Sequence, residues 1–453
     1  MMRKNTFITI FLSLTLSACS LAPEFARPAM DMPNGWNGAA GVAGGAHATP
    51  ADTPFWEELG SAELDDLIDI ALSQNLDLEA ALHRIEEARA LAKVAAAPLY
   101  PQVNASGSAS RTYQTSPQSQ TTNAAQGSAS ISWEVDLWGK NRNAAKSGNY
   151  RADASVFDRD ALRLVVTSDV TNFYTQLLGL NDRIAIGANN LKNAQEVLRI
   201  IEARFKEGAV SGLEVSQQRV EVNTLQSALA ALNEQRTTTL NALAVLLGKA
   251  PQNFAAPKTE FAALSVPEVD LTPPAELLTA RPDIQSAEAG LRAANADIGV
   301  ARAAFFPSLT LSADTAIAAG FGNPAAAVSS LAANILAPIF SGGRLTGNLQ
   351  NVTARQKELA AGYRKTVLTA FQEVEDALAA LKSNNEQAEV AERSVAESQN
   401  AYNIAKARLD AGAIDYVTFL VTQRSLYQAE DNRIVVDEAR LAAFVQLRKA
   451  LGA

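Results

Sequence analysis

Two kinds of apolar pattern occur along the chain, and the first is helical. Residues 140–207 and the matching stretch that ends near 410 hold few Gly or Pro residues, and their apolar side chains recur every three or four positions. A clear example is the series Val367, Phe371, Val374, Leu378 and Leu381. At about 1.5 Å per residue, a helix over 140–207 is on the order of 100 Å long. This spacing predicts coiled-coil packing of two very long helices.

The second pattern is a strict alternation of polar and apolar side chains, which predicts β-strands. It covers 102–110, 127–135 and 308–314, and less cleanly 330–339. The stretches 111–124 and 317–327 are rich in small or polar side chains and are predicted to be loops. Strands of about 9–11 residues with this period are typical of membrane-spanning barrels, although soluble β-sandwiches contain them too.

A proline marks each change from helix to strand. Pro101 and Pro307 follow helical stretches at about 61–97 and 275–304, and proline both stops a helix and pushes the residue before it towards extended geometry. Aromatic residues lie beside these prolines and where the strands return: Tyr100, Trp138, Phe305, Phe306 and Phe340. Around membrane-spanning strands they would form an aromatic belt at the interface. The alternative is that they are core residues near a turn.

The N-terminus has the pattern of a secretion signal. Arg3 and Lys4 precede an apolar stretch from Phe7 to Leu16, which is too short to span a bilayer as a helix. The stretch ends in Leu-Ser-Ala-Cys, and Cys19 is the only cysteine. This ending resembles the bacterial lipobox, in which cleavage leaves an acylated cysteine; the alternative is an ordinary signal peptide with a chance cysteine. No other apolar run reaches helical spanning length, so only strands can enter a membrane.

The two halves of the chain repeat each other at an offset of about 204 residues. Residues 203–219 align with 407–424, and 72–90 align with 278–296. The predicted parts are a signal peptide at 1–18, a lipid-anchored extended segment at 19–60, a first repeat at 61–249, a Pro-rich linker at 250–274 and a second repeat at 275–453. Each repeat reads as a helix, two strands, a long helix and a further helix. Glycines are predicted to form its turns: Gly139, Gly208, Gly342, Gly343 and Gly412.

Composition and charge argue against several function classes. The net charge of −9 comes without a basic patch, which argues against nucleic-acid binding. With two histidines and one cysteine, the chain shows no metal-ligand spacing and no catalytic arrangement, so we expect neither an enzyme nor a cofactor beyond a lipid on Cys19. His83 lies among charged residues and is expected to be solvated. A purely structural coiled-coil lipoprotein is a further alternative, but it does not explain four alternating strands.

Four strands are too few to close a barrel, because about eight is the smallest useful number. Open strand edges are not tolerated in lipid, so copies of the chain must close the sheet together. A dimer would give about eight strands and a filled interior, whereas a trimer would give about twelve strands and a lumen. Ser, Asn and Gln at the inward positions favour the trimer.

These features together resemble the outer membrane factor family, the TolC-like channels, and in particular its lipoprotein (OprM/NodT-like) branch. The resemblance covers essentially the whole mature chain. It rests on Cys19 and on the segments WEVDLWGK (133–140), RPDIQSAE (281–288), ARAAFFPSL (301–309), PIFSGGR (338–344), TAFQEVEDAL (369–378) and TQRSLYQAE (422–430). It implies a mixed α+β membrane protein, in which three chains form a twelve-stranded β-barrel continuous with a long α-helical barrel.

The resemblance also implies a function and partners. A homotrimer in the outer membrane would act as the passive exit duct of a tripartite efflux system for drugs and other small molecules. It would dock to a periplasmic adaptor and to an inner-membrane transporter of the resistance–nodulation–division (RND) type. Type I protein secretion and metal-ion efflux are the alternatives within the channel class. Met30 and Met32 are the only methionines after the signal, so no Met stripe supports copper or silver export.

In the family that this chain resembles, the helix ends furthest from the membrane close the channel. These ends correspond here to the turns at 205–215 and 409–424. Relatives often place an acidic ring where this chain has Val421, one helical turn beyond Val417. Two rings of valine would hold back ions by dewetting. The alternative is that both valines are ordinary coiled-coil seam residues.

The same turns carry charged residues that we expect to act in closure. Arg424 is expected to tie the closed tip by an ion pair with Asp415 or Glu214 of a neighbouring subunit. By resemblance, the helix ends and the grooves between them would receive the helical hairpins of the adaptor. Gly208 and Gly412 end their helices in the usual way, which needs no function.

Overall fold

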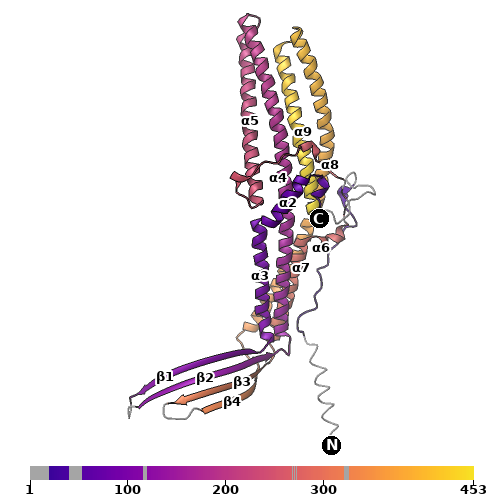
Figure 1. Cartoon of the computed structure of the whole chain (residues 1–453). Coiled ribbons are helices and arrows are strands. Elements are labelled where there is room, and N and C mark those ends of the chain that lie inside the picture. Colours follow the sequence, from indigo (N-terminus) through magenta and orange to yellow (C-terminus); the bar gives the residue numbers. More distant parts are fainter. Residues whose placement is uncertain are drawn as a thin grey trace. The chain divides into compact units, whose positions relative to one another are not determined.

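The computed structural model describes residues 20–39, 54–115, 120–267, 269, 271, 273–320 and 326–452. These residues form four strands and eight α-helices, with short 3₁₀ turns between some of them (Figure 1). The strands are β1 Gln102–Gln114, β2 Gln120–Val135, β3 Ser308–Gly320 and β4 Ala326–Leu336. The helices are α2 Ala62–Gln74, α3 Leu76–Ala96, α4 Lys140–Lys206, α5 Gly212–Leu246, α6 Leu277–Ala280, α7 Pro282–Ala303, α8 Arg344–Asp410 and α9 Tyr416–Leu451.

The two long helices confirm the helical pattern. Helices α4 and α8 each run for 67 residues without a break. At about 1.5 Å per residue, each is on the order of 100 Å long. Each is followed by a tight turn and a second long helix, α5 or α9, so the order helix, strand, strand, long helix, helix occurs twice. Among the described residues, no helix combines the length and the apolar character needed to cross a bilayer.

The strands form one antiparallel sheet in the order β1-β2-β3-β4, with β2 and β3 joining the two repeats (Figure 1). Its register separates two faces. Ile131 lies opposite Val103 on one side and Ala313 on the other, whereas the next residue along, Ser130, lies opposite Asn104 and Asp314. One face of the sheet is therefore largely apolar and the other polar. Within the described residues, β1 and β4 are edges that pair on one side only.

Both predicted loops between the strands are wrong in extent. Strand β1 continues to Gln114 and β2 begins at Gln120, so most of 111–124 is strand, and β3 and β4 likewise take up most of 317–327. The sequence hid these extensions because small and polar side chains occupy both faces there. The ladder itself continues regardless, with Tyr113 paired to Thr121.

The helix predicted at about 61–97 is divided into α2 and α3 at Asn75. The Oδ1 atom of Asn75 accepts hydrogen bonds from the backbone N–H groups of Asp77 and Leu78, each at 3.0 Å. Its Nδ2 donates to the carbonyl of Leu246 at 2.8 Å. The side chain therefore caps the start of α3 and fixes it to the end of α5.

The chain divides into two compact units, and each unit draws on both repeats. The first takes in the N-terminal residues to Met30, Leu82–Asp158 and Asp283–Thr366, which include the sheet, most of α3 and α7, and the first parts of α4 and α8. The second takes in Asp31–Ala81, Arg159–Pro282 and Val367–Ala453, which include α2, α5, α6, α9 and the rest of α4 and α8.

The main apolar core lies in the second unit. Phe55, Tyr174 and Phe444 are fully buried there, among leucine and isoleucine side chains from α2, α4, α5 and α9. The Pro-rich linker covers part of this core and is held by Glu63. The Glu63 carboxylate accepts hydrogen bonds from the backbone N–H groups of Lys258 and Thr259 and from the Thr259 hydroxyl. The linker is thus a packed part of the unit.

Candidate functional site

The turn between α4 and α5 is built by one glycine and a capping box. Gly208 has φ +76°, a left-handed conformation that side-chain-bearing residues rarely adopt. Ser211 then begins α5: its hydroxyl accepts from the backbone N–H of Leu213 at 3.2 Å, and Glu214 accepts from the backbone N–H of Ser211 at 2.9 Å. Glu214 also accepts a hydrogen bond from the Ser211 hydroxyl, and this bond is the main cause that lowers the pKa of Glu214. Within the chain, Glu214 therefore serves the start of its own helix.

The turn between α8 and α9 has the same plan with other residues. Gly412 has φ +68°, and Asp415 caps α9. The Asp415 carboxylate accepts from the backbone N–H of Thr418 at 2.8 Å and from its hydroxyl at 2.9 Å. These two hydrogen bonds lower the pKa of Asp415. All the predicted turn glycines have φ between 58° and 86°: Gly139, Gly208, Gly342, Gly343 and Gly412.

We predict that Ser211→Ala loosens the first turn of α5, whereas Glu214→Gln barely changes it. Loss of an N-cap hydroxyl costs about 1 kcal/mol, but glutamine can take the place of glutamate in a capping box. Hydrogen exchange of the amides at 213–217 measures the difference, with about fivefold faster exchange expected in Ser211→Ala. Equal acceleration in the two variants would mean that the charge of Glu214, and not the cap, holds this turn.

Val417 and Val421 lie on the exposed side of α9. Their side chains are 51% and 58% exposed, whereas Phe419 and Leu420 between them are buried in a small core with Ile201 of α4. Neither valine is a seam residue within the described chain. Both are available to face a channel axis or another subunit. Their role as a constriction stays a prediction.

Arg424 has a partner that the sequence did not indicate. Its Nε donates to Oε2 of Glu221 on α5 at 2.5 Å, and Glu221 is 4% exposed. A buried carboxylate needs such a counter-charge. Within the chain, the Asp415 carboxylate caps α9 and lies nine residues before Arg424, about 13 Å away along the helix axis. Glu214 is likewise occupied by its capping box, and a pair between subunits stays a prediction.

A row of buried polar contacts extends this link between the two helical hairpins. The hydroxyl of Tyr416 donates to Oε1 of Gln218, whose Nε2 donates to the carbonyl of Ala194 at 2.7 Å. Further along α9, Gln423 donates to the Tyr427 hydroxyl at 2.8 Å. Burial raises the pKa of Tyr416, and the neighbouring Glu221 raises it further. The tyrosine therefore stays protonated and able to donate.

A groove of about 830 Å³ lies between α4, α5 and α9 beside this row. Its charged lining includes the Arg424–Glu221 pair and a second pair, in which Arg183 binds both carboxylate oxygens of Asp431 at 2.7 and 3.0 Å. Leucine and alanine side chains of α5 supply much of its apolar lining. The groove is thus an amphipathic surface along the helices.

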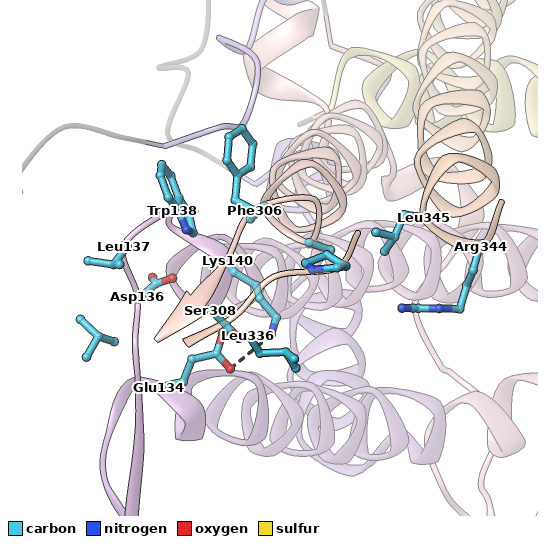
Figure 2. Close-up of a pocket in the computed structure, with 14 residues that line it drawn as sticks. Glu134, Asp136, Leu137, Trp138, Lys140, Phe306, Ser308, Leu336, Arg344 and Leu345 are labelled. Carbon is cyan, nitrogen blue, oxygen red and sulfur yellow. Dashed lines mark hydrogen bonds and ion pairs between the residues drawn. The ribbon is translucent and has the colours of Figure 1, made fainter. Parts of the chain in front are cut away.

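In the first unit, the helix–strand junction is fixed by tryptophan hydrogen bonds. Trp138 stacks on Phe306 with ring centroids 4.7 Å apart (Figure 2). Its Nε1 donates to the carbonyl of Pro307 at 2.7 Å. Trp133 donates in the same way to the carbonyl of Leu99 at 3.1 Å, next to Tyr100 and Pro101. The two indole groups therefore join the end of β2 and its return to the chain segments that follow α3 and α7.

The remaining aromatics at the junction are open to solvent in the single chain. Phe305 and Phe306 are 40% exposed, Tyr100 is 68% exposed and Phe340 is 91% exposed. Such apolar exposure at one end of the sheet fits a membrane interface. The belt itself stays a prediction.

A cavity of about 550 Å³ opens beside this junction (Figure 2). Lys140 reaches Glu134 across it at 3.1 Å, while Asp136 accepts from the backbone N–H groups of Asn141 and Arg142 and so caps α4. These charges stabilise a helix start and a strand end. Among the described residues, no cluster of His, Cys, Asp and Glu is placed to hold a metal ion.

Known proteins match this chain in both sequence and architecture. The family model described as "Outer membrane efflux protein" matches residues 67–249 and 274–453. The chain is 38% identical to the pyoverdine export outer membrane protein OpmQ of Pseudomonas aeruginosa, over 97% of this chain and 94% of OpmQ. It is 33% identical to the outer membrane protein OprJ of the same organism, over 100% and 96% of the two chains. A crystal structure of CusC matches with a TM-score of 0.86 and 29% identity, over 96% of this chain and 100% of that one.

The family model matches one segment in each repeat, and together these segments make up most of the chain. The relatives align over nearly their whole length. The members of this family are channel proteins, which work as trimers with an adaptor and an inner-membrane pump. The chain therefore belongs to the outer membrane efflux protein family, and it is an outer-membrane channel of an efflux system.

Proposed function

We propose that three copies of this chain form the exit duct for small organic molecules delivered by an RND-type pump through a periplasmic adaptor. The observation that carries the proposal is the open sheet. In the part of the chain that the structure describes, strands β1 and β4 pair on one side only, and the side chains of Val103 and Leu331 on these edge strands are 70% and 87% exposed. Unpaired edges and an apolar face in lipid require neighbouring subunits that complete the barrel.

The helical part supports the same proposal. Two hairpins of very long helices, α4–α5 and α8–α9, supply a wall long enough to extend the channel away from the membrane. The groove beside the Arg424–Glu221 pair offers apolar and charged groups to an adaptor helix. The duct itself uses no energy, and the inner-membrane pump supplies the energy for transport.

Small-molecule export is favoured over the alternatives because OpmQ, which is 38% identical, is named for export of pyoverdine. Metal-ion efflux is the second candidate, since CusC of Escherichia coli K12, at 31% identity, is named a cation efflux system protein. Protein secretion is the third, and neither OpmQ nor CusC is named for it. The three differ in what accumulates or disappears when the gene is deleted.

We further propose that Cys19 carries the membrane lipid of a lipoprotein. Cys19 lies outside the described residues, so the proposal rests on the sequence Leu-Ser-Ala-Cys after an apolar signal. An acyl chain would give the protein a second membrane anchor in addition to the barrel. Mass spectrometry of the N-terminal peptide tests it: an unmodified residue 19, or cleavage elsewhere, contradicts the anchor.

Deletion of the gene is expected to raise ethidium retention and to lower tolerance of several unrelated drugs. Both changes should be reversed by the wild-type gene at matched membrane levels, but not by an empty vector. Unchanged retention combined with a protein missing from the culture medium would favour secretion and contradict efflux of small molecules. Sensitivity limited to copper or silver would favour the metal alternative instead.

A further inference from the structure

Residues 20–27 lie along α7 in the first unit, in the opposite direction to the helix. Their contacts follow one another in order, from the C-terminal end of α7 towards its start. They are Arg302 Nη1 to the carbonyl of Leu21 at 3.2 Å, Asn295 Nδ2 to the carbonyl of Pro23 at 2.8 Å, and Arg27 to Glu288 at 2.8 Å. The six steps from Leu21 to Arg27 cover about 20 Å in an extended chain, and the fourteen steps from 302 to 288 cover about 21 Å along the helix. The segment is therefore an extended strap on α7, held along its whole length.

Gly299 makes room for this strap. A Cβ atom at position 299 would lie 2.8 Å from Cβ of Ala22, 2.9 Å from its backbone nitrogen and 2.5 Å from Nδ2 of Asn143. Real Cβ atoms essentially never lie so close to a neighbouring atom, so any larger residue at position 299 must displace the strap at Ala22 and turn the Asn143 side chain away. Asn143 is 1% exposed and accepts a hydrogen bond from the Ser20 hydroxyl at 3.2 Å. Gly299 and Asn143 together form the floor of the groove in which the strap begins.

The other end of the strap is closed by a buried carboxylate. Glu288, with a side chain 9% exposed, pairs with Arg27 of the strap and with Arg292 of its own helix, the latter at 2.6 Å. The Arg292 guanidinium also lies over the ring of Phe25, 4.9 Å from its centroid. Since a buried carboxylate is costly without full pairing, the strap supplies part of what stabilises Glu288.

We propose that the groove around Gly299 is a binding site for the N-terminal strap, and that the bound strap sets where the lipid on Cys19 enters the membrane. Ser20 directly follows Cys19, and it is held at Asn143, near the end of α7 that leads to Phe305, Phe306 and Pro307. The proposal therefore places the start of the lipid beside the aromatic residues of the helix–strand junction. The proposal rests on the proposed acylation of Cys19.

A free N-terminus would not place its lipid in this way. About 30 flexible residues have a root-mean-square span of roughly 30 Å, so a lipid on an unbound tether would sample a wide area around the channel. A strap fixed from Ser20 onwards reduces this range to the reach of one residue and its acyl chain. The position of the anchor is then a property of the folded protein.

The test uses the full-length chain with two glycine variants of α7. Gly299→Leu fills the groove, whereas Gly290→Leu adds the same side chain to the same helix at a position with nothing within 4 Å of a Cβ. In both, Phe25 is replaced by the photoreactive benzoylphenylalanine. Crosslinking of position 25 to α7 is expected in the wild type and in Gly290→Leu, and about tenfold less in Gly299→Leu. Equal crosslinking in the two variants would contradict the proposal that the groove around Gly299 binds the strap.

A second label reports the position of the lipid itself. Cells fed a diazirine-bearing fatty acid acylate Cys19 with a photoreactive chain, and mass spectrometry maps where it reacts after illumination. Crosslinks concentrated at residues 303–307 and 138 are expected in the wild type and in Gly290→Leu, and dispersed ones in Gly299→Leu. Crosslinks that stay concentrated in Gly299→Leu, or are dispersed in the wild type, overturn the placement. Absence of label on Cys19 overturns the lipid anchor and with it the placement, while the benzoylphenylalanine crosslink still decides whether the groove binds the strap.

Discussion

Replacing Val417 and Val421 together with serine is expected to raise the leak conductance of the purified channel in planar bilayers several-fold. Both side chains are more than half exposed and lie one helical turn apart near the start of α9, pointing away from the buried Phe419 and Leu420. In a trimer they would form two apolar rings at the end of the helices. A narrow apolar constriction holds back ions because water leaves it, and hydroxyl groups rewet it.

The matched control is the double variant Val390→Ser with Val435→Ser. These valines, on α8 and α9, are also partly exposed, at 52% and 39%, but they lie further from the tips. Their leak is expected to stay at the wild-type level. An equal rise in both double variants would mean that serine merely loosens helix packing. Unchanged leak in Val417→Ser with Val421→Ser would place the constriction elsewhere, with Arg424 and its partner Glu221 as the nearest ionic candidates.

The parts of the fold that the sequence predicted are those in which one pattern dominates many residues. The 67-residue helices α4 and α8 follow from a long apolar period without breakers, and the strand cores follow from strict alternation before and after Pro101 and Pro307. The ends of the strands could not be predicted, because polar side chains on both faces remove the alternation. There the backbone ladder, as at Tyr113 and Thr121, extends the strand without help from burial.

The contacts of the candidate site were harder to predict, because each depends on one residue from each of two distant helices. Glu221 is the clearest case: it pairs with Arg424, 203 residues away, and the only local signal is an acid one residue before the buried Val222 and three after the buried Gln218. The strap is a second case. Nothing in residues 20–27 reveals their partner, and Gly299 looks in the sequence like any helix-interior glycine.

We expect Glu438→Gln to stabilise the protein at pH 8 and to have much less effect at pH 5. Glu438 lies on α9 against Gly179 of α4, where a Cβ would come within 3.1 Å of its Oε2. Burial raises the pKa of Glu438 from 4.5 to about 7, although Arg183 nearby opposes the shift. Arg183 donates hydrogen bonds from Nε and Nη2 to the Asp431 carboxylate, which limits how far it can stabilise the charge of Glu438. At pH 8 the folded protein must therefore hold an ill-solvated carboxylate.

The direction follows from proton binding. Because the pKa is higher in the folded than in the unfolded state, protonated Glu438 favours folding at low pH, and this stability is lost as the pH rises from 4.5 through about 7. A shift of this size is worth up to about 3 kcal/mol, and roughly 1–2 kcal/mol after screening of a half-buried group. Glutamine keeps the shape of the side chain without its charge. The gain in free energy of unfolding from Glu438→Gln should therefore be about fourfold larger at pH 8 than at pH 5.

Thermal unfolding of the detergent-solubilised protein at the two pH values measures this difference as a shift of the midpoint. Glu397→Gln, on the exposed side of α8, removes the same charge and is expected to leave the midpoint unchanged at both values. An advantage of Glu438→Gln that does not depend on pH would mean that packing against Gly179, and not ionisation, is the cause. A loss of stability at pH 8 would mean that the charge is needed there, with Arg183 shared between Glu438 and Asp431. In that case Arg183, Glu438 and Asp431 form an ionic network that holds α4 against α9, and the charge of Arg183 offsets the cost of burying the Glu438 carboxylate.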